Sequence, residues 1–222
     1  ATALFHSAIV SNSRKIFNNW TILLSILCIV GCFIGMFLVR SGILTSVHSF
    51  ALDPERGLIL LLLTFGITLY SFYVFFRSDV NDENTINYSL ISKEYFLLIN
   101  NLFLVILAAI ILFGTIYPIF YEIFSDGKNI SVGAPYFNLV TVPIAFFLAF
   151  FQGYGVLTKW QESPLELKPF LIILLSLFGL SIFFSYLIFN DLSLFNLAGI
   201  IMLSLILAGV FLSAFRNFNK GK

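Results

Sequence analysis

The two histidines are the side chains of this sequence best suited to chemistry, and they stand in different kinds of segment. His6 lies in an apolar run eight residues before Arg14, whereas His48 follows a charge-free stretch that ends at Arg40. An imidazole can form hydrogen bonds, transfer a proton or bind a metal ion near neutral pH. The residues around each histidine therefore have to indicate which of these roles applies.

His6 is expected to lie inside an apolar layer. Along a helix it stands about 12 Å from Arg14, which would mark the boundary of that layer. An imidazole at this depth needs a partner. It can be a neutral histidine that is hydrogen-bonded to a neighbouring helix, or an axial ligand of a heme iron, because neutral imidazole is a standard heme ligand. The residues alone leave both interpretations open.

His48 is flanked by Arg40 and Arg56. A guanidinium matches the geometry of a carboxylate, so a histidine between two arginines suits a ligand with carboxylates, such as heme with its propionates. Other anions would fit the same arginines, and Arg56 could instead pair with Asp53 or Glu55. His48 could also be an interfacial histidine without a special role.

Other catalytic patterns are weak in this sequence. Ser46 stands two residues before His48, and Asp53 could orient the imidazole, but this spacing is common by chance and nothing marks an oxyanion hole. There is no glycine-rich phosphate loop, no H-E-x-x-H and no nucleophile elbow. Cys28 and Cys32 stand four residues apart in an apolar run and are interpreted as packing residues. We therefore assign no catalytic residue.

The composition is that of an integral membrane protein. Hydrophobic residues make up 59% and charged residues 10% of the 222 residues, whereas soluble domains carry about a quarter charged residues. A net charge of +1 without a basic cluster indicates no nucleic-acid partner. Six charge-free stretches reach the roughly 20 residues that a membrane-spanning helix needs: 20–39, 57–76, 95–121, 135–158, 169–190 and 192–215.

The predicted fold class is all-α, a polytopic transmembrane helix bundle that forms a single transmembrane domain over residues 1–222. It has six full spans and one partial N-terminal span at residues 1–12, which are too few to cross a bilayer. We expect these residues to be the last turns of a helix that begins upstream, in a larger membrane protein. The last two spans are joined only around Asp191 and are expected to form a tight hairpin.

The basic residues predict the orientation in the membrane. If residues 1–12 end on the cytoplasmic side, nine of the 12 Lys and Arg residues fall in inner segments, and only Arg40, Arg56 and Lys128 fall outside. The segment 41–56 with His48 is then outside. We expect a multi-pass protein of the bacterial inner (plasma) membrane or, alternatively, of the mitochondrial inner membrane.

Five sequence blocks together resemble a known family. They are TALFHS from residue 2, FLVRSGILTSVHSFALDPERG from residue 37, SKEYFLLINN from residue 92, LFGTIYPIF from residue 112 and ISVGAPYFN from residue 130. Their order and spacing are similar to those of the CcmF family, the membrane heme lyase subunit of cytochrome c maturation. The resemblance covers residues 1 to about 160, and beyond residue 169 only the helical hairpin supports it.

The resemblance implies a function, a cofactor and partners. CcmF-like proteins receive heme from the heme chaperone CcmE and, with CcmH-type thiol partners, take part in its covalent attachment to apocytochrome c. A histidine placed like His6 is one axial ligand of a permanent heme b, which is thought to keep the incoming iron reduced. A histidine placed like His48 is one of two external ligands of the arriving heme. Arg40 and Arg56 are then candidates for contacts with its propionates.

Two departures from the family limit this expectation. The tryptophan-rich external motif is missing, because only Trp20 and Trp160 occur, and we expect that motif just before residue 1. With only His6 and His48, the chain supplies at most one ligand to each heme, so by itself it is not expected to catalyse heme ligation. Two other classes remain open, a cofactor-free membrane assembly subunit and a solute transporter. The charge-free spans disfavour the transporter, because they hold no intramembrane charge for ion coupling.

Overall fold

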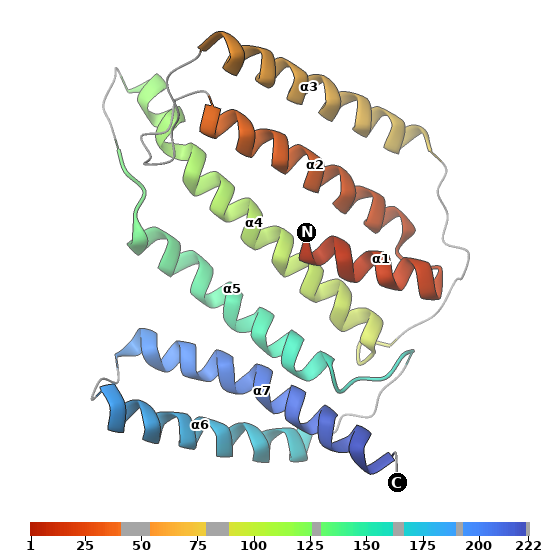
Figure 1. The fold of residues 1–222 in the computed structure, drawn as a ribbon, viewed down its shortest axis with the longest axis vertical. Helices are drawn as coiled ribbons and strands as arrows, with labels where there is room; N and C mark the ends of the chain where they lie inside the picture. Colours follow the sequence, from red (N-terminus) through yellow and green to blue (C-terminus); the bar gives the residue numbers. More distant parts are fainter. Residues whose placement is uncertain (41–53, 79–88, 126–129, 162–166, 190–192, 221–222) are drawn as a thin grey trace. The chain divides into compact units, whose positions relative to one another are not determined.

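A computed structural model describes residues 1–40, 54–78, 89–125, 130–161, 167–189 and 193–220. Within these ranges the regular elements are all helices, with no strand. They are α1 (Thr2–Arg14), α2 (Asn18–Arg40), α3 (Pro54–Arg77), α4 (Lys93–Phe124), α5 (Ala134–Gly155), α6 (Leu167–Phe189) and α7 (Leu194–Lys220) (Figure 1). The expected all-α fold class is confirmed.

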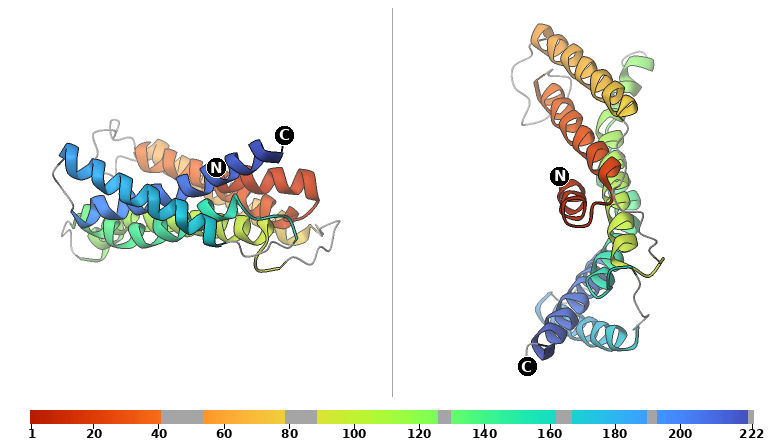
Figure 2. Two further views of the ribbon diagram at one scale, coloured as in Figure 1. Left: turned by 90° about the horizontal axis from the view of Figure 1, so that it is seen from below. Right: turned by 90° about the vertical axis from the view of Figure 1, so that its right-hand side faces the viewer.

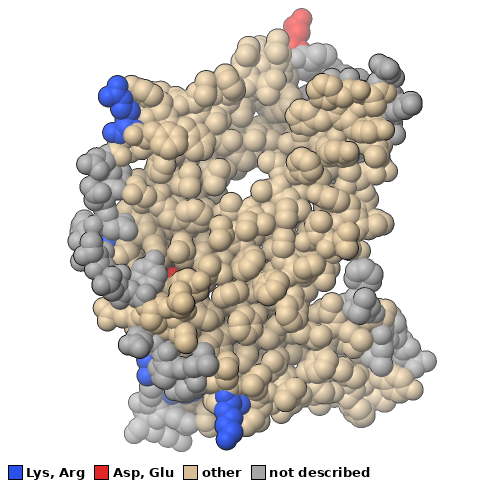
Figure 3. All heavy atoms as spheres, turned by 180° about the vertical axis from the view of Figure 1, so that it is seen from behind, with Lys and Arg blue, Asp and Glu red and all other residues tan. Residues whose placement is uncertain are grey.

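Helices α2 to α7 are long and apolar enough to cross a membrane, and α1 is the expected partial helix. The protein is therefore a multi-pass membrane protein. In the face seen in Figure 3, almost all of the described surface is uncharged, and charged side chains occupy only small areas of it. Basic residues in the last turns of α2 and α3, Arg40 and Arg77, stand at the negative ends of the helix dipoles.

The end of α5 differs from the sequence expectation. The apolar stretch continues to residue 158, but the helix ends at Gly155. The chain then turns, because the Leu157 N–H donates to the Tyr154 carbonyl at 2.9 Å and the Thr158 hydroxyl donates to the Gly155 carbonyl at 2.7 Å. Residues 156–158, which belong to the same charge-free stretch, thus form a turn rather than a last helical turn.

The chain divides into two compact units, and the first contains α1, α2 and α3. In it α1 packs on α2 and α2 packs on α3, as Figure 2 also shows. Between α1 and α2 the backbone turns through Lys15 and Phe17, whose φ angles are 61° and 64°. This left-handed conformation costs a residue with a side chain about 1–2 kcal/mol.

Hydroxyl groups hold α1 against α2. The Ser7 and Thr21 hydroxyl oxygens lie 2.7 Å apart, and the Ser11 hydroxyl donates to Asn18 Oδ1 at 2.6 Å. Ser7 is almost completely buried. Because Ser7 and Ser11 are one helical turn apart, the two contacts fix which face of α1 is turned toward α2.

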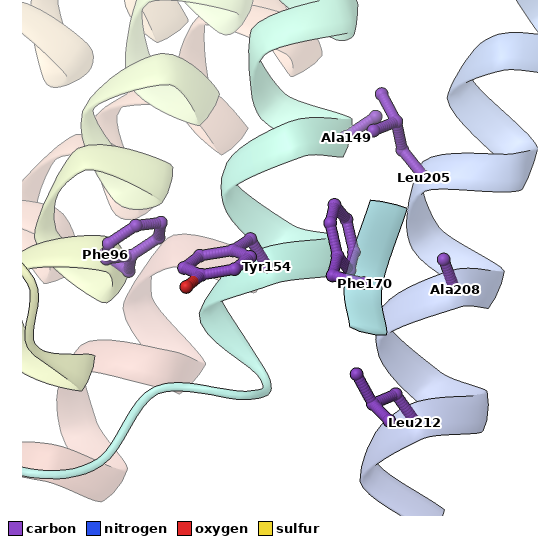
Figure 4. Packing of buried hydrophobic residues seen from close by; sticks show 7 residues of the cluster. All are labelled: Phe96, Ala149, Tyr154, Phe170, Leu205, Ala208 and Leu212. Atoms are coloured by element: carbon purple, nitrogen blue, oxygen red, sulfur yellow. The ribbon is translucent and has the colours of Figure 1, made fainter. Parts of the chain in front are cut away.

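The second unit contains α5, α6, α7 and the first part of α4. Helix α7 packs against both α5 and α6. The Tyr154 ring lies between two phenylalanine rings, with centroid distances of 5.6 Å to Phe96 and 5.3 Å to Phe170 (Figure 4). The buried apolar cluster consists of Phe96, Ala149, Tyr154, Phe170, Leu205, Ala208 and Leu212.

Helices α5 and α7 approach each other backbone to backbone at Gly153 and Gly209. A Cβ atom added to Gly209 would overlap the Gly153 backbone, and one added to Gly153 would overlap the Leu205 carbonyl group. Small residues permit this kind of close approach between transmembrane helices. The contact therefore requires glycine at both positions.

A third glycine joins two of the sequence blocks named above. A Cβ atom on Gly114 of α4 would lie 2.6 Å from Tyr136 Cε1 and 2.9 Å from Phe137 Cε1. Helix α5 begins just before this aromatic pair, with Gly133 as its extended N-cap and a proline in the first turn. The LFGTIYPIF and ISVGAPYFN blocks thus meet at an aromatic contact that a larger residue at position 114 would displace.

Candidate functional site

Arg40 and Arg56 line the same hollow in the first unit. It has a volume of ≈ 570 Å³ and lies between the end of α2 and the start of α3. The other residues of this arginine hollow are Gly35, Met36, Val39 and Leu60. The structure therefore brings together two site residues that the sequence analysis singled out, next to an apolar wall.

The chain order explains why these residues meet. Arg40 is the last residue of α2 and Arg56 is the third residue of α3, and the segment 41–53 joins the two helices. Met36 and Arg40 stand one turn apart on α2, as Arg56 and Leu60 do on α3. Each helix thus contributes one arginine together with apolar residues of the same face.

The arginine hollow is open to a ligand. Met36 is 48% exposed and Val39 is 39% exposed, so the apolar wall can be reached from outside the unit. Arg56 makes a further interaction, and a guanidinium has several N–H donors to share between partners. The arrangement suits an amphipathic ligand with an apolar body and carboxylate or other anionic groups.

His48 lies outside the described residues, as do Ser46 and Asp53. The segment 41–53 that carries them starts directly after Arg40 and ends directly before α3. The role of His48 as a ligand and the alternative set of Ser46, His48 and Asp53 both stay predictions.

His6 is placed in the first half of α1, next to the buried Ser7 that contacts α2. Its Nδ1 atom is buried and has no hydrogen-bond partner among the residues that the structure describes. The imidazole ring is tilted against Phe5 at a centroid distance of 6.3 Å. Leaving a buried polar atom without a partner costs about 1–3 kcal/mol. A hydrogen-bond partner beyond the described residues would offset this cost, and an imidazole that binds heme iron through Nε2 leaves Nδ1 available for such a bond. His6 therefore fits both a heme ligand and a hydrogen-bonded histidine.

A polar set in the second unit was not predicted from the sequence. Glu94 is 0% exposed, and both of its carboxylate oxygens accept the backbone N–H of Gln161, at 3.1 and 2.9 Å. The adjacent Lys93 N–H donates to the Lys159 carbonyl at 2.8 Å, and Lys93 Nζ lies 5.5 Å from the centroid of the Trp160 ring. Two segments far apart in the sequence are thereby joined at the start of α4.

A signal for this set is present in the sequence. Ser92 directly precedes α4, and its hydroxyl oxygen accepts the Tyr95 N–H at 3.2 Å, as in an N-cap. An acidic residue two positions after such a cap belongs in the first helical turn. The burial of Glu94 is not readable from this pattern, because it depends on the distant Gln161.

The cysteines form no site in the structure. Cys28 and Cys32 are free thiols. Among the described residues, His, Cys, Asp and Glu side chains form no group of three or more that could hold a metal ion. Cys28 is half-buried and Cys32 is exposed, so the interpretation of both as packing residues stays a prediction.

Comparisons with known proteins identify relatives of this chain. The chain is 42% identical over 165 residues to the cytochrome c-type biogenesis protein CcmF of Pseudomonas fluorescens. The aligned residues make up 74% of this chain and 25% of the relative. The chain is 39% identical over 190 residues to the cytochrome c-type biogenesis protein ccl1 of Rhodobacter capsulatus, covering 81% of this chain and 28% of the relative. No protein-family model matches the chain.

A solved structure shares the fold. The structure of a cytochrome c heme lyase CcmF superposes with a TM-score of 0.68 at 24% identity, over 97% of this chain and 31% of that chain. The present chain spans about a quarter of the length of the curated relatives that it matches. With identities near 40% to these relatives over about three quarters of its length, the chain belongs to the CcmF family of cytochrome c-type biogenesis proteins.

Proposed function

We propose that this chain takes part in c-type cytochrome biogenesis by binding heme at two positions. The observation that carries the proposal is the arginine hollow, in which Arg40 and Arg56 stand beside an apolar wall. Heme combines an apolar ring with carboxylate groups at one edge. The apolar residues match the ring, and the guanidinium groups match the propionates.

The first heme is the one in transit to apocytochrome c. Arg40 and Arg56 bind its propionates, and His48, on the segment that joins α2 and α3, provides one ligand to its iron. A site reached from outside, with one histidine from this chain, suits a ligand that has to leave again. The second iron ligand comes from elsewhere, because the chain has only two histidines and His6 belongs to α1.

The second heme is a resident heme b, for which His6 provides one axial ligand. The place of His6 in the apolar first half of α1, next to the buried Ser7, supports this assignment. When bound, the heme b supplies electrons that keep the incoming iron reduced. The contacts of Ser7 and Ser11 with α2 hold α1, and hence the imidazole, in a fixed rotation.

The same proposal includes partners and location. The heme donor is the heme chaperone CcmE, a CcmH-type thiol protein is a further partner, and the acceptor is apocytochrome c. The complete protein has the activity of a heme lyase in the bacterial inner membrane, with the segment 41–56 on the outside; the mitochondrial inner membrane is the alternative. The excess of basic residues on the predicted inner side supports this orientation. That residues 1–222 act as one transmembrane domain stays a prediction.

The test separates propionate binding from general heme binding. The purified protein is titrated with heme and with heme dimethyl ester, and absorbance reports both affinities. Hydrogen bonds to charged groups contribute about 1.5–3 kcal/mol each, so Arg40→Gln with Arg56→Gln should weaken heme binding by at least about tenfold. The affinity for the dimethyl ester should stay unchanged. Arg77→Gln, at the opposite end of α3, is the control and should leave both affinities unchanged.

Histidine variants separate the two hemes. In His6→Ala the b-type absorbance should disappear, whereas in His48→Ala it should remain and heme transfer to apocytochrome c should fail. A full heme b spectrum in His6→Ala contradicts the first assignment, and a normal cytochrome c yield in His48→Ala contradicts the second. Equal losses for heme and its dimethyl ester in the double arginine variant contradict propionate binding.

A further inference from the structure

A second hollow, in the second unit, is lined by three basic residues. It has a volume of ≈ 280 Å³ and lies where the start of α4, the end of α5 and the last turns of α7 meet. Its cations are Lys93, Lys159 and Arg216. The remaining residues of this basic pocket are Val156, Leu157, Thr158, Trp160, Ser213 and Asn217, so none of its lining residues that the structure describes is acidic.

Two walls of the basic pocket are tied together by hydrogen bonds. The Lys93 N–H donates to the Lys159 carbonyl at 2.8 Å, and the Ser89 N–H donates to the Gln161 carbonyl at 2.9 Å. The Gln161 N–H, in turn, is held by the buried Glu94 carboxylate. Lys93 and Lys159, from segments distant in the sequence, are thus kept side by side by their own backbones.

The described lining residues of the pocket carry a net positive charge. Glu94 is the buried carboxylate behind the wall, and both of its oxygens are used by the Gln161 N–H. Lys159 and Arg216 make further interactions, but an ammonium and a guanidinium each have several donors to share. Pairing of these cations with Glu162 or Glu166, in the segment 162–166 outside the described residues, is the competing arrangement.

The position of the pocket along the helices indicates its ligand. It is formed by helix ends, where the apolar spans give way to basic and aromatic residues such as Lys93 and Trp160. At this level of a bilayer lie the lipid phosphates, and basic pockets between transmembrane helices bind anionic head groups. Val156, which is 42% exposed, gives the pocket an apolar edge.

We propose that the basic pocket of Lys93, Lys159 and Arg216 binds the phosphate group of an anionic membrane lipid. The side chains of Ser213 and Asn217 add a hydroxyl and an amide group that can donate hydrogen bonds to phosphate oxygens. This site lies in the second unit, whereas His6 and the arginine hollow lie in the first. The inference therefore does not depend on the heme-binding proposal.

The test measures lipid binding directly. The purified protein is titrated with phosphatidylglycerol, with phosphatidylcholine and with inorganic phosphate, and native mass spectrometry counts the bound molecules. The pocket variant combines Lys93→Gln, Lys159→Gln and Arg216→Gln. Each basic residue near an anionic lipid contributes a factor of about five, so phosphatidylglycerol binding should weaken on the order of 100-fold. Binding of phosphatidylcholine should not change.

A matched variant removes the same charge elsewhere. It combines Arg14→Gln, Arg77→Gln and Lys168→Gln, three basic residues on the same predicted side that do not line the pocket. Its affinity for phosphatidylglycerol should stay close to that of the unaltered protein. Thermal unfolding of both triple variants shows whether they are folded, and a bound lipid should raise the unfolding temperature of the control but not of the pocket variant.

Three results would overturn the proposal. Equal losses in both triple variants would mean that net surface charge alone attracts the lipid. Inorganic phosphate that binds as tightly as phosphatidylglycerol would make the pocket a site for a soluble anion. An unchanged affinity in the pocket variant, together with a higher affinity in Glu162→Gln with Glu166→Gln, would mean that internal ion pairs occupy it.

Discussion

The arginine hollow and the basic pocket both gather cations at helix ends, yet they are built for different ligands. The arginine hollow is larger, at ≈ 570 Å³, and places two arginines beside apolar residues. The basic pocket, at ≈ 280 Å³, places three cations beside hydroxyl and amide groups. The first can accept an extended apolar molecule with acidic groups, and the second can accept a compact, strongly charged group.

The two hollows also differ in what holds their walls. Two helix ends line the arginine hollow, and the residues that connect them are 41–53. Two of the three segments of the basic pocket are linked by backbone hydrogen bonds and by the buried Glu94. Basic residues alone therefore do not identify a ligand. The neighbouring side chains, apolar in one hollow and polar in the other, indicate which ligand each site suits.

The largest expected effect is the loss of the basic pocket in a variant that keeps the arginine hollow. In Gly209→Leu the new side chain would overlap the Gly153 backbone, and overpacking of this kind costs up to about 3 kcal/mol. The free energy of unfolding, measured by circular dichroism in detergent, should fall by about this amount. Binding of anionic lipid should be lost, whereas heme binding that depends on Arg40 and Arg56 should remain.

The control for this variant lies on the same helix. A Cβ atom on Gly199 would meet nothing within 4 Å, so Gly199→Leu should leave both the free energy of unfolding and lipid binding unchanged. If Gly209→Leu and Gly199→Leu behaved alike, the close contact of α5 and α7 would not determine the shape of the basic pocket.

An intermediate effect is expected from the buried carboxylate. In Glu94→Gln the hydrogen bond to the Gln161 N–H loses its charge, and bonds to charged groups are about 1 kcal/mol stronger than neutral ones. The free energy of unfolding should fall by about 1–2 kcal/mol, and lipid binding should weaken because Lys93 and Lys159 are held less firmly. Glu122→Gln, an exposed position near the end of α4, should change neither quantity. Equal behaviour of the two variants would show that Glu94 does not brace the pocket.

The smallest expected effect concerns the first unit alone. Ser7→Ala removes the contact with the Thr21 hydroxyl, and hydrogen bonds between transmembrane helices contribute about 0.6 kcal/mol on average. The free energy of unfolding should fall by this amount, and the absorbance of a heme bound at His6 should shift because α1 is less firmly held. Ser13→Ala, whose exposed hydroxyl only contacts its own helix, should shift neither. A change in lipid binding by Ser7→Ala would contradict the separation of the two sites.

Most of the fold could be predicted from the sequence because spans depend on local composition. A charge-free run of sufficient length has to be a helix in a membrane. Each of the six runs contains such a helix. The end of α5 was predicted three residues too late, since residues 156–158 carry no charge but their backbone turns. The contact of Gly153 with Gly209 could not be predicted, because nothing local distinguishes these glycines from Gly199 or Gly179.

The candidate site was predictable in part. Arg40 and Arg56 could be expected to meet because two adjacent spans end and begin near them, and the structure places both at one hollow. The basic pocket was not predicted, although all of its cations were visible. Lys93, Lys159 and Arg216 are far apart in the sequence, and their convergence depends on the packing of α7 against α5. The positions of these three residues in the sequence do not indicate that they line one pocket.

The close approach of α5 and α7 has a consequence for ligand size. Ser213 follows Gly209 by one helical turn of α7, Leu157 follows Gly153 by four residues in the turn after α5, and both Leu157 and Ser213 line the basic pocket. At these two glycines α5 and α7 touch through backbone atoms, which keeps the helices close together. This small separation of the helices sets the width of the neighbouring basic pocket. Exchange of glycine for alanine would change this width without altering any charge. Discrimination between head groups of different bulk can therefore evolve at residues that never touch the ligand.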